Sequence, residues 1–312
     1  MAIPFRLKII FFFGTILFPI SSWTQEVFNY ANFSEQLQFI NPAFSGIETK
    51  AILSTRNQWM SIDNAPQTTS FAVSSPLKNN LGVGLNVLSN SMFVQSRTIA
   101  SADISYKLTI SEQSEIYLGL RGGGYFYRAD PLSLSTSSQL TDPSQQVQAS
   151  FAPVIGAGLY WTFNSFWLSY SAPQLVKLGN LDPTINSVIN IQHYAAAGFN
   201  FSLTENFQLK NALILRKSEN FDATQQYSSS LSYQNLIELG ATYYSSGNGA
   251  LTGMLNISNL FSIGYAYEKA LSSQTSGLDR RTHEIFISVN LDSILGKSPE
   301  VEQDEEVETN QQ

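Results

Sequence analysis

The fold is decided by the stretch Ala100-Ser101-Ala102-Asp103-Ile104-Ser105-Tyr106-Lys107-Leu108. Ala, Ala, Ile, Tyr and Leu alternate here with Ser, Asp, Ser and Lys. A β-strand points successive side chains to opposite faces, so this segment has one apolar and one polar side. The same alternation returns at Ile237–Tyr244 and at Glu284–Leu291. We predict an all-β fold, a transmembrane antiparallel β-barrel whose apolar face contacts lipid; the alternative is a soluble, secreted β-sandwich.

The alternating pattern predicts about 14 strands, an even number as bacterial single-chain barrels require. The predicted strands are Thr49–Met60, Gln67–Ser75, Leu81–Ser89, Ser96–Leu108, Ser114–Tyr127, Ser150–Thr162, Phe166–Ser171, Ile191–Leu203, Phe207–Arg216, Gln225–Tyr233, Leu236–Tyr244, Ala250–Ile257, Phe261–Tyr267 and Thr282–Leu291. Short and longer links alternate between them, with Asn90–Gln95 and Ser245–Gly249 counted among the longer ones. Outer-membrane barrels have short periplasmic turns and longer extracellular loops, so both termini are expected to be periplasmic.

The N-terminus predicts export. Arg6 and Lys8 precede an apolar run from Ile9 to Ile20, which is typical of a secretory signal peptide covering residues 1–24. That run is short for a spanning helix, and no longer apolar run follows. We therefore divide the chain into the signal peptide, a plug-like segment at 25–47, the barrel at 48–291, and an acidic tail at 292–312 that we expect to be disordered and periplasmic.

Composition agrees with a barrel wall and excludes some functions. Charged residues make up 13% of the chain, whereas about 25% is usual in soluble proteins. The predicted signal peptide holds two of the 17 basic residues, which leaves 15 against 24 acidic ones. That balance disfavours nucleic-acid binding. Cysteine is absent, so thiol chemistry is excluded.

The polar face of the strands is expected to line a lumen. In the segment Tyr117–Tyr127, Leu118 and Leu120 should face lipid while Arg121 faces inward. Charged lumenal candidates are Asp103, Lys107, Arg121, Lys210, Arg216, Glu238, Glu268 and Glu284. They could form an internal network of ion pairs or line a transport pathway, and the sequence leaves both open.

No motif indicates an enzyme. The histidines are His193 and His283, and no nucleophile stands beside a base in a known arrangement. His283 and Glu284 are adjacent on a strand, so their side chains point to opposite faces. We expect no catalysis, no cofactor and no metal site.

Turn chemistry precedes the first strand. Asn41, Pro42, Ala43 and Gly46 belong to the turn, and Arg56, Asn57, Gln58 and Trp59 follow on the strand. Pro42 fixes φ, Gly46 permits a positive φ, and the Arg56 guanidinium can donate to several acceptors. We expect the turn to pack against the first strand at the periplasmic mouth, either as a structural seal or as a docking site for a partner.

Several stretches resemble the PorP/SprF family of Bacteroidetes outer-membrane proteins, which serve type IX secretion. The family's INPAYAG element is similar to Phe39–Gly46. Further similarities, in chain order, are Arg56-Asn57-Gln58-Trp59, Ala65-Pro66-Gln67-Thr68, Ser74-Ser75-Pro76-Leu77-Lys78, Gly82-Val83-Gly84-Leu85, Leu118-Gly119-Leu120-Arg121-Gly122-Gly123 with Phe126-Tyr127, Ile263-Gly264-Tyr265-Ala266-Tyr267 and His283-Glu284-Ile285. The acidic tail departs from the family, as does a last strand that ends in Leu291.

The resemblance implies a non-enzymatic component in the Gram-negative outer membrane. Its partners would be membrane lipid, other type IX secretion components, and a secreted cargo with a C-terminal sorting domain, such as a cell-surface adhesin used in gliding motility. The alternative function is a passive outer-membrane channel or a transporter of hydrophobic solutes. The two differ in whether the lumen is open.

Overall fold

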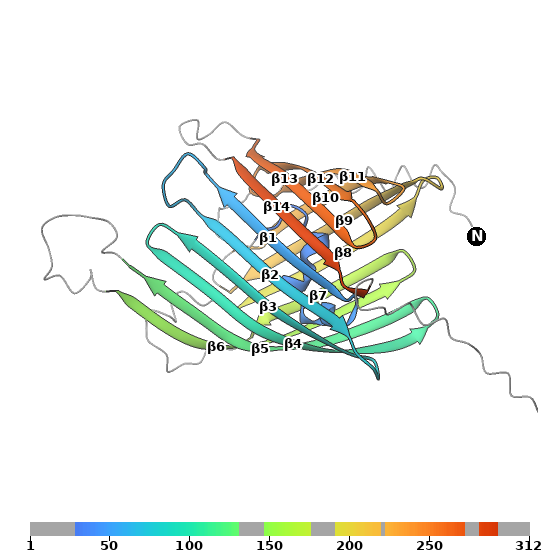
Figure 1. Ribbon diagram of the computed structural model, residues 1–312, viewed down its shortest axis with the longest axis horizontal. Coiled ribbons are helices and arrows are strands. Elements are labelled where there is room, and N and C mark those ends of the chain that lie inside the picture. The colour runs from blue at the N-terminus through green and yellow to red at the C-terminus, as the bar shows by residue number, and fades with distance from the viewer. Residues whose placement is uncertain (1–28, 131–146, 176–190, 220–221, 272–280, 293–312) are drawn as a thin grey trace, which may run out of the picture.

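The computed structural model describes residues 29–130, 147–175, 191–219, 222–271 and 281–292, and within them the chain forms a closed antiparallel barrel of 14 strands (Figure 1). The predicted signal peptide and the acidic tail beyond Asp292 lie outside these residues. Each strand pairs with its neighbours in sequence, and β1 pairs with β14 to close the sheet. The strands are β1 Lys50–Gln58, β2 Gln67–Pro76, β3 Leu81–Met92, β4 Gln95–Ser111, β5 Ser114–Ala129, β6 Gln148–Phe163, β7 Phe166–Gln174, β8 Gln192–Ser202, β9 Phe207–Ser218, β10 Thr224–Tyr233, β11 Ile237–Tyr244, β12 Asn248–Asn256, β13 Phe261–Ala270 and β14 Thr282–Asn290.

The two faces of the wall differ in chemistry, as the alternation predicts. Leu120 is 62% exposed on the outer face, whereas its neighbour Arg121 is 5% exposed on the inner face. Leu239 and Leu251 are exposed in the same way on the opposite part of the wall. Such a continuous apolar outer surface suits contact with lipid tails, and closure pairs the backbone groups that lipid would leave without partners.

Two 3-10 helices, η1 Phe33–Phe39 and η2 Pro42–Gly46, precede the barrel in the chain. In Figure 1 they are the blue coils within the ring of strands. None of the helices in the described part of the chain has the length and apolar character needed to cross a membrane.

The links fall into two sets, one at each end of the barrel. At the short-link end, β2–β3, β4–β5, β6–β7, β8–β9, β10–β11 and β12–β13 are joined by tight turns. At the long-link end, the connections include residues 59–66, 130–147, 175–191 and 271–281. The longest links all fall at one end, as predicted, but the alternation of link length is not regular along the chain.

Two of the predicted longer links are shorter than expected. Only Phe93 and Val94 separate β3 from β4, because Asn90, Ser91 and Met92 continue the pairing with β4. Phe93 adopts a φ of 52°, in the left-handed region, which makes this tight reversal possible. The link between β11 and β12 is similarly reduced to residues 245–247. Polar side chains occur both in loops and where a strand faces the lumen, so the sequence does not distinguish the two in these segments.

The orientation of β5 gives a prediction. Leu120→Arg places a charge on the lipid-facing wall, and such a change costs about 2–4 kcal/mol near the middle of a bilayer. Leu77→Arg is the matched control, because Leu77 is also exposed but lies in the β2–β3 turn. Unfolding in urea from lipid vesicles should show a large loss of stability for Leu120→Arg alone. Equal losses in the two variants would contradict the outward orientation of Leu120.

Candidate functional site

The interior of the barrel is occupied by the chain's own N-terminal segment, which we define as residues 29–49. One side of this segment is apolar and buried against the inner face of the wall. Its apolar contributors are Tyr30, Phe33, Leu37, Phe39 and Ile40, which form a core cluster with Ile52, Ala72, Tyr194, Ala196, Ala212, Ile214, Met254 and Phe286. The segment is thus packed as a core element and is not loosely enclosed.

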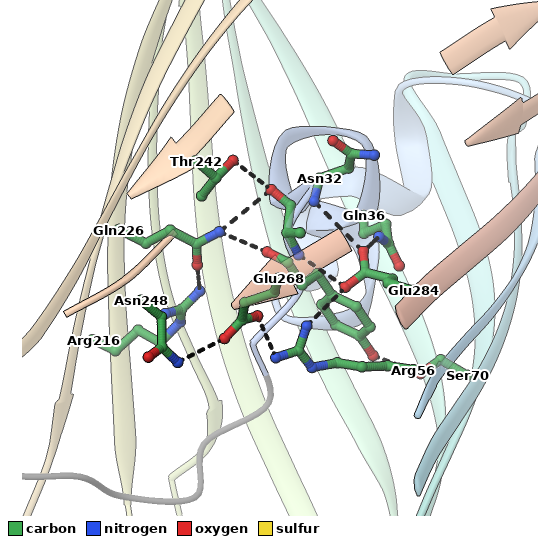
Figure 2. Close-up of polar contacts among 12 residues, drawn as sticks. Asn32, Gln36, Arg56, Ser70, Arg216, Gln226, Thr242, Asn248, Glu268 and Glu284 are labelled. Carbon is green, nitrogen blue, oxygen red and sulfur yellow. Dashed lines mark hydrogen bonds and ion pairs between the residues drawn. The ribbon is translucent and has the colours of Figure 1, made fainter. Parts of the chain in front are cut away.

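Polar contacts hold the first part of the segment at Glu284 (Figure 2). The Glu284 carboxylate accepts from the backbone N–H of Ala31 at 2.9 Å and from Gln36 Nε2 at 2.7 Å. Arg56 Nη1 lies 3.3 Å from the same carboxylate. Gln36 reaches Glu284 at a point where helix η1 is interrupted by non-helical backbone angles. The Glu284 carboxylate, which is 1% exposed, thus has donors from both the wall and the segment.

Arg56 joins Glu284 to a second buried carboxylate. Its Nη2 atom donates to Glu268 Oε2 at 2.7 Å, and Asn248 donates to the other oxygen of Glu268 at 2.8 Å. The guanidinium thus serves two carboxylates on neighbouring strands, β13 and β14. We call Arg56, Glu268 and Glu284 the Arg56 cluster.

Backbone carbonyls of the segment are bound by wall side chains beside this cluster. Gln226 Nε2 donates to the Tyr30 carbonyl at 2.6 Å, and Thr242 Oγ1 donates to the Ala31 carbonyl at 3.0 Å. Arg216 donates in turn to Gln226 Oε1, as Figure 2 shows. Irregular backbone inside a barrel needs such partners, because unpaired buried carbonyls are costly.

A second arginine holds the middle of the segment. Arg121 forms two hydrogen bonds with Asp103, each of 2.8 Å, and donates to the carbonyls of Phe39 at 2.8 Å and Gln38 at 3.0 Å. Asn86 also donates to Asp103, at 2.7 Å. The guanidinium is therefore a bridge between the wall and the backbone of the segment.

The turn Asn41–Gly46 is seated against glycines. Asn41 caps η2, since its Oδ1 accepts from the Ala43 N–H at 2.9 Å, and its Nδ2 donates to Ser169 Oγ at 2.8 Å. A Cβ added at Gly119 would lie 2.2 Å from the Ala43 nitrogen, and one at Gly158 would lie 2.0 Å from Asn41 Oδ1. The wall can approach this turn only where it lacks side chains.

The role expected of Gly46 is corrected by this geometry. Among the described residues the one glycine with a positive φ is Gly247, so Gly46 is not needed for a left-handed conformation. A Cβ added at Gly82 would lie 2.2 Å from the Gly46 Cα, and one at Gly46 would lie 2.5 Å from Ser105 Oγ. Gly46 is required for close approach to β3 and β4.

The expected grouping of the turn with Arg56-Asn57-Gln58-Trp59 is not observed. Helix η2 contacts β2 to β6, whereas Arg56 contacts β13 and β14. Asn57 is at a position of β1 that faces outward, and Gln58 lines the lumen near the long-link end. Trp59 lies in the β1–β2 link, where its N–H donates to the Arg281 carbonyl at 2.9 Å. Only Arg56 of this tetrapeptide takes part in holding the segment.

The predicted lumenal charges all lie on the inner face, and all but Arg216 form an ion pair with another inward-facing side chain; Arg216 donates to the neutral Gln226. Beyond the two arginine clusters, Lys210 pairs with Glu238 at 2.7 Å and Lys107 with Glu115 at 3.1 Å. In the segment, burial opposes ionisation of Glu35, but the positive charges of Lys50 and Lys210 lower its pKa below the usual value. This is the internal ion-pair network, one of the two alternatives left open by the sequence.

Sequence reasoning missed the partners that belong to the segment. Tyr30, Gln36, Gln226, Thr242 and the seat glycines carry no motif of their own. The available signal was glycine at inward positions of strands, as at Gly82, Gly84, Gly119 and Gly158, which indicates an object packed close to the wall.

In the described part of the barrel, two cavities border the segment, one on each side of it. The long-link cavity, of about 100 Å³, is lined by Tyr30, Phe39 and Ile40 of the segment and by wall residues including Gln58, Arg97 and Gln192. The short-link cavity, of about 240 Å³, is lined by Glu35, Phe44 and Ile47 and by wall residues including Lys50 and Lys210. In the described residues no group of three His, Asp or Glu side chains is placed to hold a metal ion.

The glycine seat gives a prediction. Gly119→Val should displace the turn, because even a Cβ at this position overlaps the Ala43 backbone. Gly122→Val is the control on the same strand, since a Cβ there meets nothing within 4 Å. The chain has no cysteine, so a Ser45→Cys reporter, buried in the parent at 2% exposure, can be labelled with a maleimide. Labelling should increase with Gly119→Val and stay low with Gly122→Val. Protection from labelling in both variants would contradict the packing of the turn against Gly119.

The Arg56 cluster gives another prediction. Glu284→Ala removes the acceptor of Arg56, Ala31 and Gln36, and breaking a buried ion pair costs about 3–5 kcal/mol. Glu115→Ala is the control, because the Lys107–Glu115 pair is about one-third exposed (35% and 34%) and should contribute about 1 kcal/mol or less. The free energy of unfolding, followed by tryptophan fluorescence, should separate them. Similar losses would show that Glu284 is not an organising contact.

Comparisons with solved structures return outer-membrane barrels. The toluene transporter TbuX of Ralstonia pickettii shows 10% identity and a TM-score of 0.49, over 80% of this chain and 91% of that one. The monoaromatic hydrocarbon channel CymD shows 10% identity and a TM-score of 0.45, over 81% and 91%. Omp33 of Acinetobacter baumannii shows 10% identity and a TM-score of 0.43, over 78% and 99%. None of the curated protein sequences matches this one.

The family comparison is more specific than the fold. Residues 23–289 match the family described as type IX secretion system membrane protein PorP/SprF. The matched range contains the N-terminal segment, both arginine clusters and the glycine seat. The chain therefore belongs to the PorP/SprF family of type IX secretion system membrane proteins.

Proposed function

We propose that this outer-membrane barrel assists the export or surface attachment of a large partner protein that carries a C-terminal sorting domain, such as an adhesin or a gliding-type cargo. The family supports a place in type IX secretion. The barrel would act without catalysis, by binding the cargo or other secretion components. The short-link end would face the periplasm, as in other outer-membrane barrels, and we expect both termini to be periplasmic.

The observation that carries this proposal is the filled lumen. The N-terminal segment is bonded to the wall through Glu284 and Arg121 and leaves cavities of about 100 and 240 Å³. Spaces of that size hold a few water molecules and not a folded domain. The barrel would therefore serve secretion as a binding partner of the cargo, while the cargo crosses the membrane elsewhere.

The alternative, a passive channel or hydrophobic-solute transporter, requires the segment to leave its seat. Many buried polar contacts would then have to break together, and the carboxylates of the Arg56 cluster would lose partners. A stable filled lumen favours docking over conduction. The expected acidic tail could add a further contact for a periplasmic partner.

Deletion of residues 25–46 tests whether the segment closes the lumen. The wall pairing does not include these residues, so we expect a heat-modifiable barrel with increased bilayer conductance and reduced surface display of the cargo. Unchanged conductance and unchanged display in the presence of folded barrel would show that the segment is dispensable.

A disulfide between the N-terminal segment and β3 tests whether the segment must leave the lumen for function. Gly84→Cys together with Ser45→Cys places two thiols on facing backbones, since a Cβ at Gly84 would lie 3.1 Å from the Ser45 Cβ. That separation is slightly below the usual Cβ–Cβ distance of a disulfide, about 3.5–4.5 Å, and needs a small adjustment. The oxidised variant should still display cargo. Loss of display on oxidation, restored by reductant, would mean that the segment must move for function.

A further inference from the structure

The long-link cavity has positive charge without matching negative charge. Three arginines, Arg56, Arg97 and Arg121, line it, whereas no Asp or Glu does so among the described residues. Arg56 and Arg121 are bound to carboxylates that lie behind the cavity wall. The positive electrostatic potential inside the cavity therefore comes mainly from Arg97.

Arg97 has no acidic partner within the described part of the chain. It lies near the long-link end of β4, in register with Asn90 on β3 and Tyr127 on β5. Its Nη2 atom donates to Gln95 Oε1 at 3.2 Å, a neutral acceptor. A half-buried guanidinium with one neutral acceptor has several donors left over.

Other polar atoms in the cavity wall also lack partners. Arg56 Nε and Gln174 Nε2 are buried donors without an acceptor, and Ser101 Oγ and Asn86 Oδ1 are buried without a hydrogen bond. Arg56, Asn86 and Ser101 are all more than nine-tenths buried. These buried atoms make the wall behind the cavity polar, whereas the donors open to a bound group are those of the half-buried Arg97.

The rest of the wall is apolar. Leu88, Ile99, Tyr125 and Val154 line the same cavity, beside Ile40 of the segment. A group that fits must present oxygens to the arginine and carbon to these side chains. The volume of about 100 Å³ restricts it to a small molecule or end group, about the size of one ring with a polar substituent.

We propose that the long-link cavity binds a carboxylate with a small apolar body, with Arg97 as its charge partner. A guanidinium matches the planar, two-oxygen geometry of a carboxylate. A single unpaired guanidinium balances one negative charge, so a monoanion fits better than a doubly charged phosphate. The carboxylate could belong to a free organic acid or to the C-terminus of a peptide entering from the long-link end. This site is independent of the proposed role in secretion.

The test uses the purified full-length barrel in detergent, with benzoate against neutral benzamide as matched probes. Saturation-transfer NMR and calorimetry should show binding of benzoate over benzamide. Arg97→Gln should weaken benzoate binding by about tenfold or more, the effect of losing a hydrogen bond to a charged group. Arg128→Gln is the control, since Arg128 is exposed on the next strand and pairs with Asp130. It should bind benzoate as the parent does.

Further arms make the outcome decisive. Arg97→Lys keeps the positive charge but lacks the two parallel N–H donors of the guanidinium, so it should bind benzoate with intermediate affinity. Heat-modifiability verifies that each variant is folded. A short peptide with a free or an amidated C-terminus separates the two sources: selective binding of the free form assigns the peptide source, and binding of benzoate alone assigns the small acid. Equal affinity for benzoate and benzamide, no binding of any probe, or unchanged affinity in Arg97→Gln would overturn the proposal.

Discussion

Pairing of β1 with β14 is the contact on which the rest of the structure depends. The two strands lie at opposite ends of the barrel sequence, and their pairing removes the open edges that a sheet in lipid cannot keep. Arg56 and Glu284 are register partners at this seam, and both point inward. The closing pair of strands thus also carries the ion pair that binds the N-terminal segment. Closure of the wall and filling of the lumen are joined at one place in the molecule.

Electrostatics explains why the lumen holds this segment. Buried carboxylates and guanidinium groups are costly unless each finds a partner. Glu284 receives donors from Ala31 and Gln36 in addition to Arg56, so the segment supplies part of the stabilisation that the wall lacks. At the other arginine the relation is reversed, because Arg121 offers donors to the Gln38 and Phe39 carbonyls. Wall and segment therefore satisfy each other, which favours a single seated arrangement.

The wall was predictable from the sequence because its signal is local. Alternation fixes which of Leu120 and Arg121 faces lipid, but it did not place the ends of β3 and β12, where polar residues continue the pairing. The position of the Asn41–Gly46 turn was not predictable, because it depends on wall glycines far away in sequence, such as Gly119 and Gly158. The motifs Asn41–Gly46 and Arg56–Trp59 are close in sequence and were therefore expected to form one site. In the structure, Asn41 and Arg56 contact different sides of the barrel. Alternation reports the face of a residue but not which distant residue lies opposite.

The filled interior constrains what a barrel of this kind can contribute to secretion. Most inward-facing charged side chains of the wall are paired inside the barrel, so few are free to attract a molecule passing through the lumen. Arg97, in the long-link cavity, is the exception, since its hydrogen bond is to a neutral acceptor. What remains available to a large protein partner is the surface at the two ends of the barrel. The two ends differ in link length: every link is short at one end, whereas the longest links, such as residues 130–147, are at the other. The proposed binding of a large partner therefore has more residues to draw on at the end that carries the longer connections.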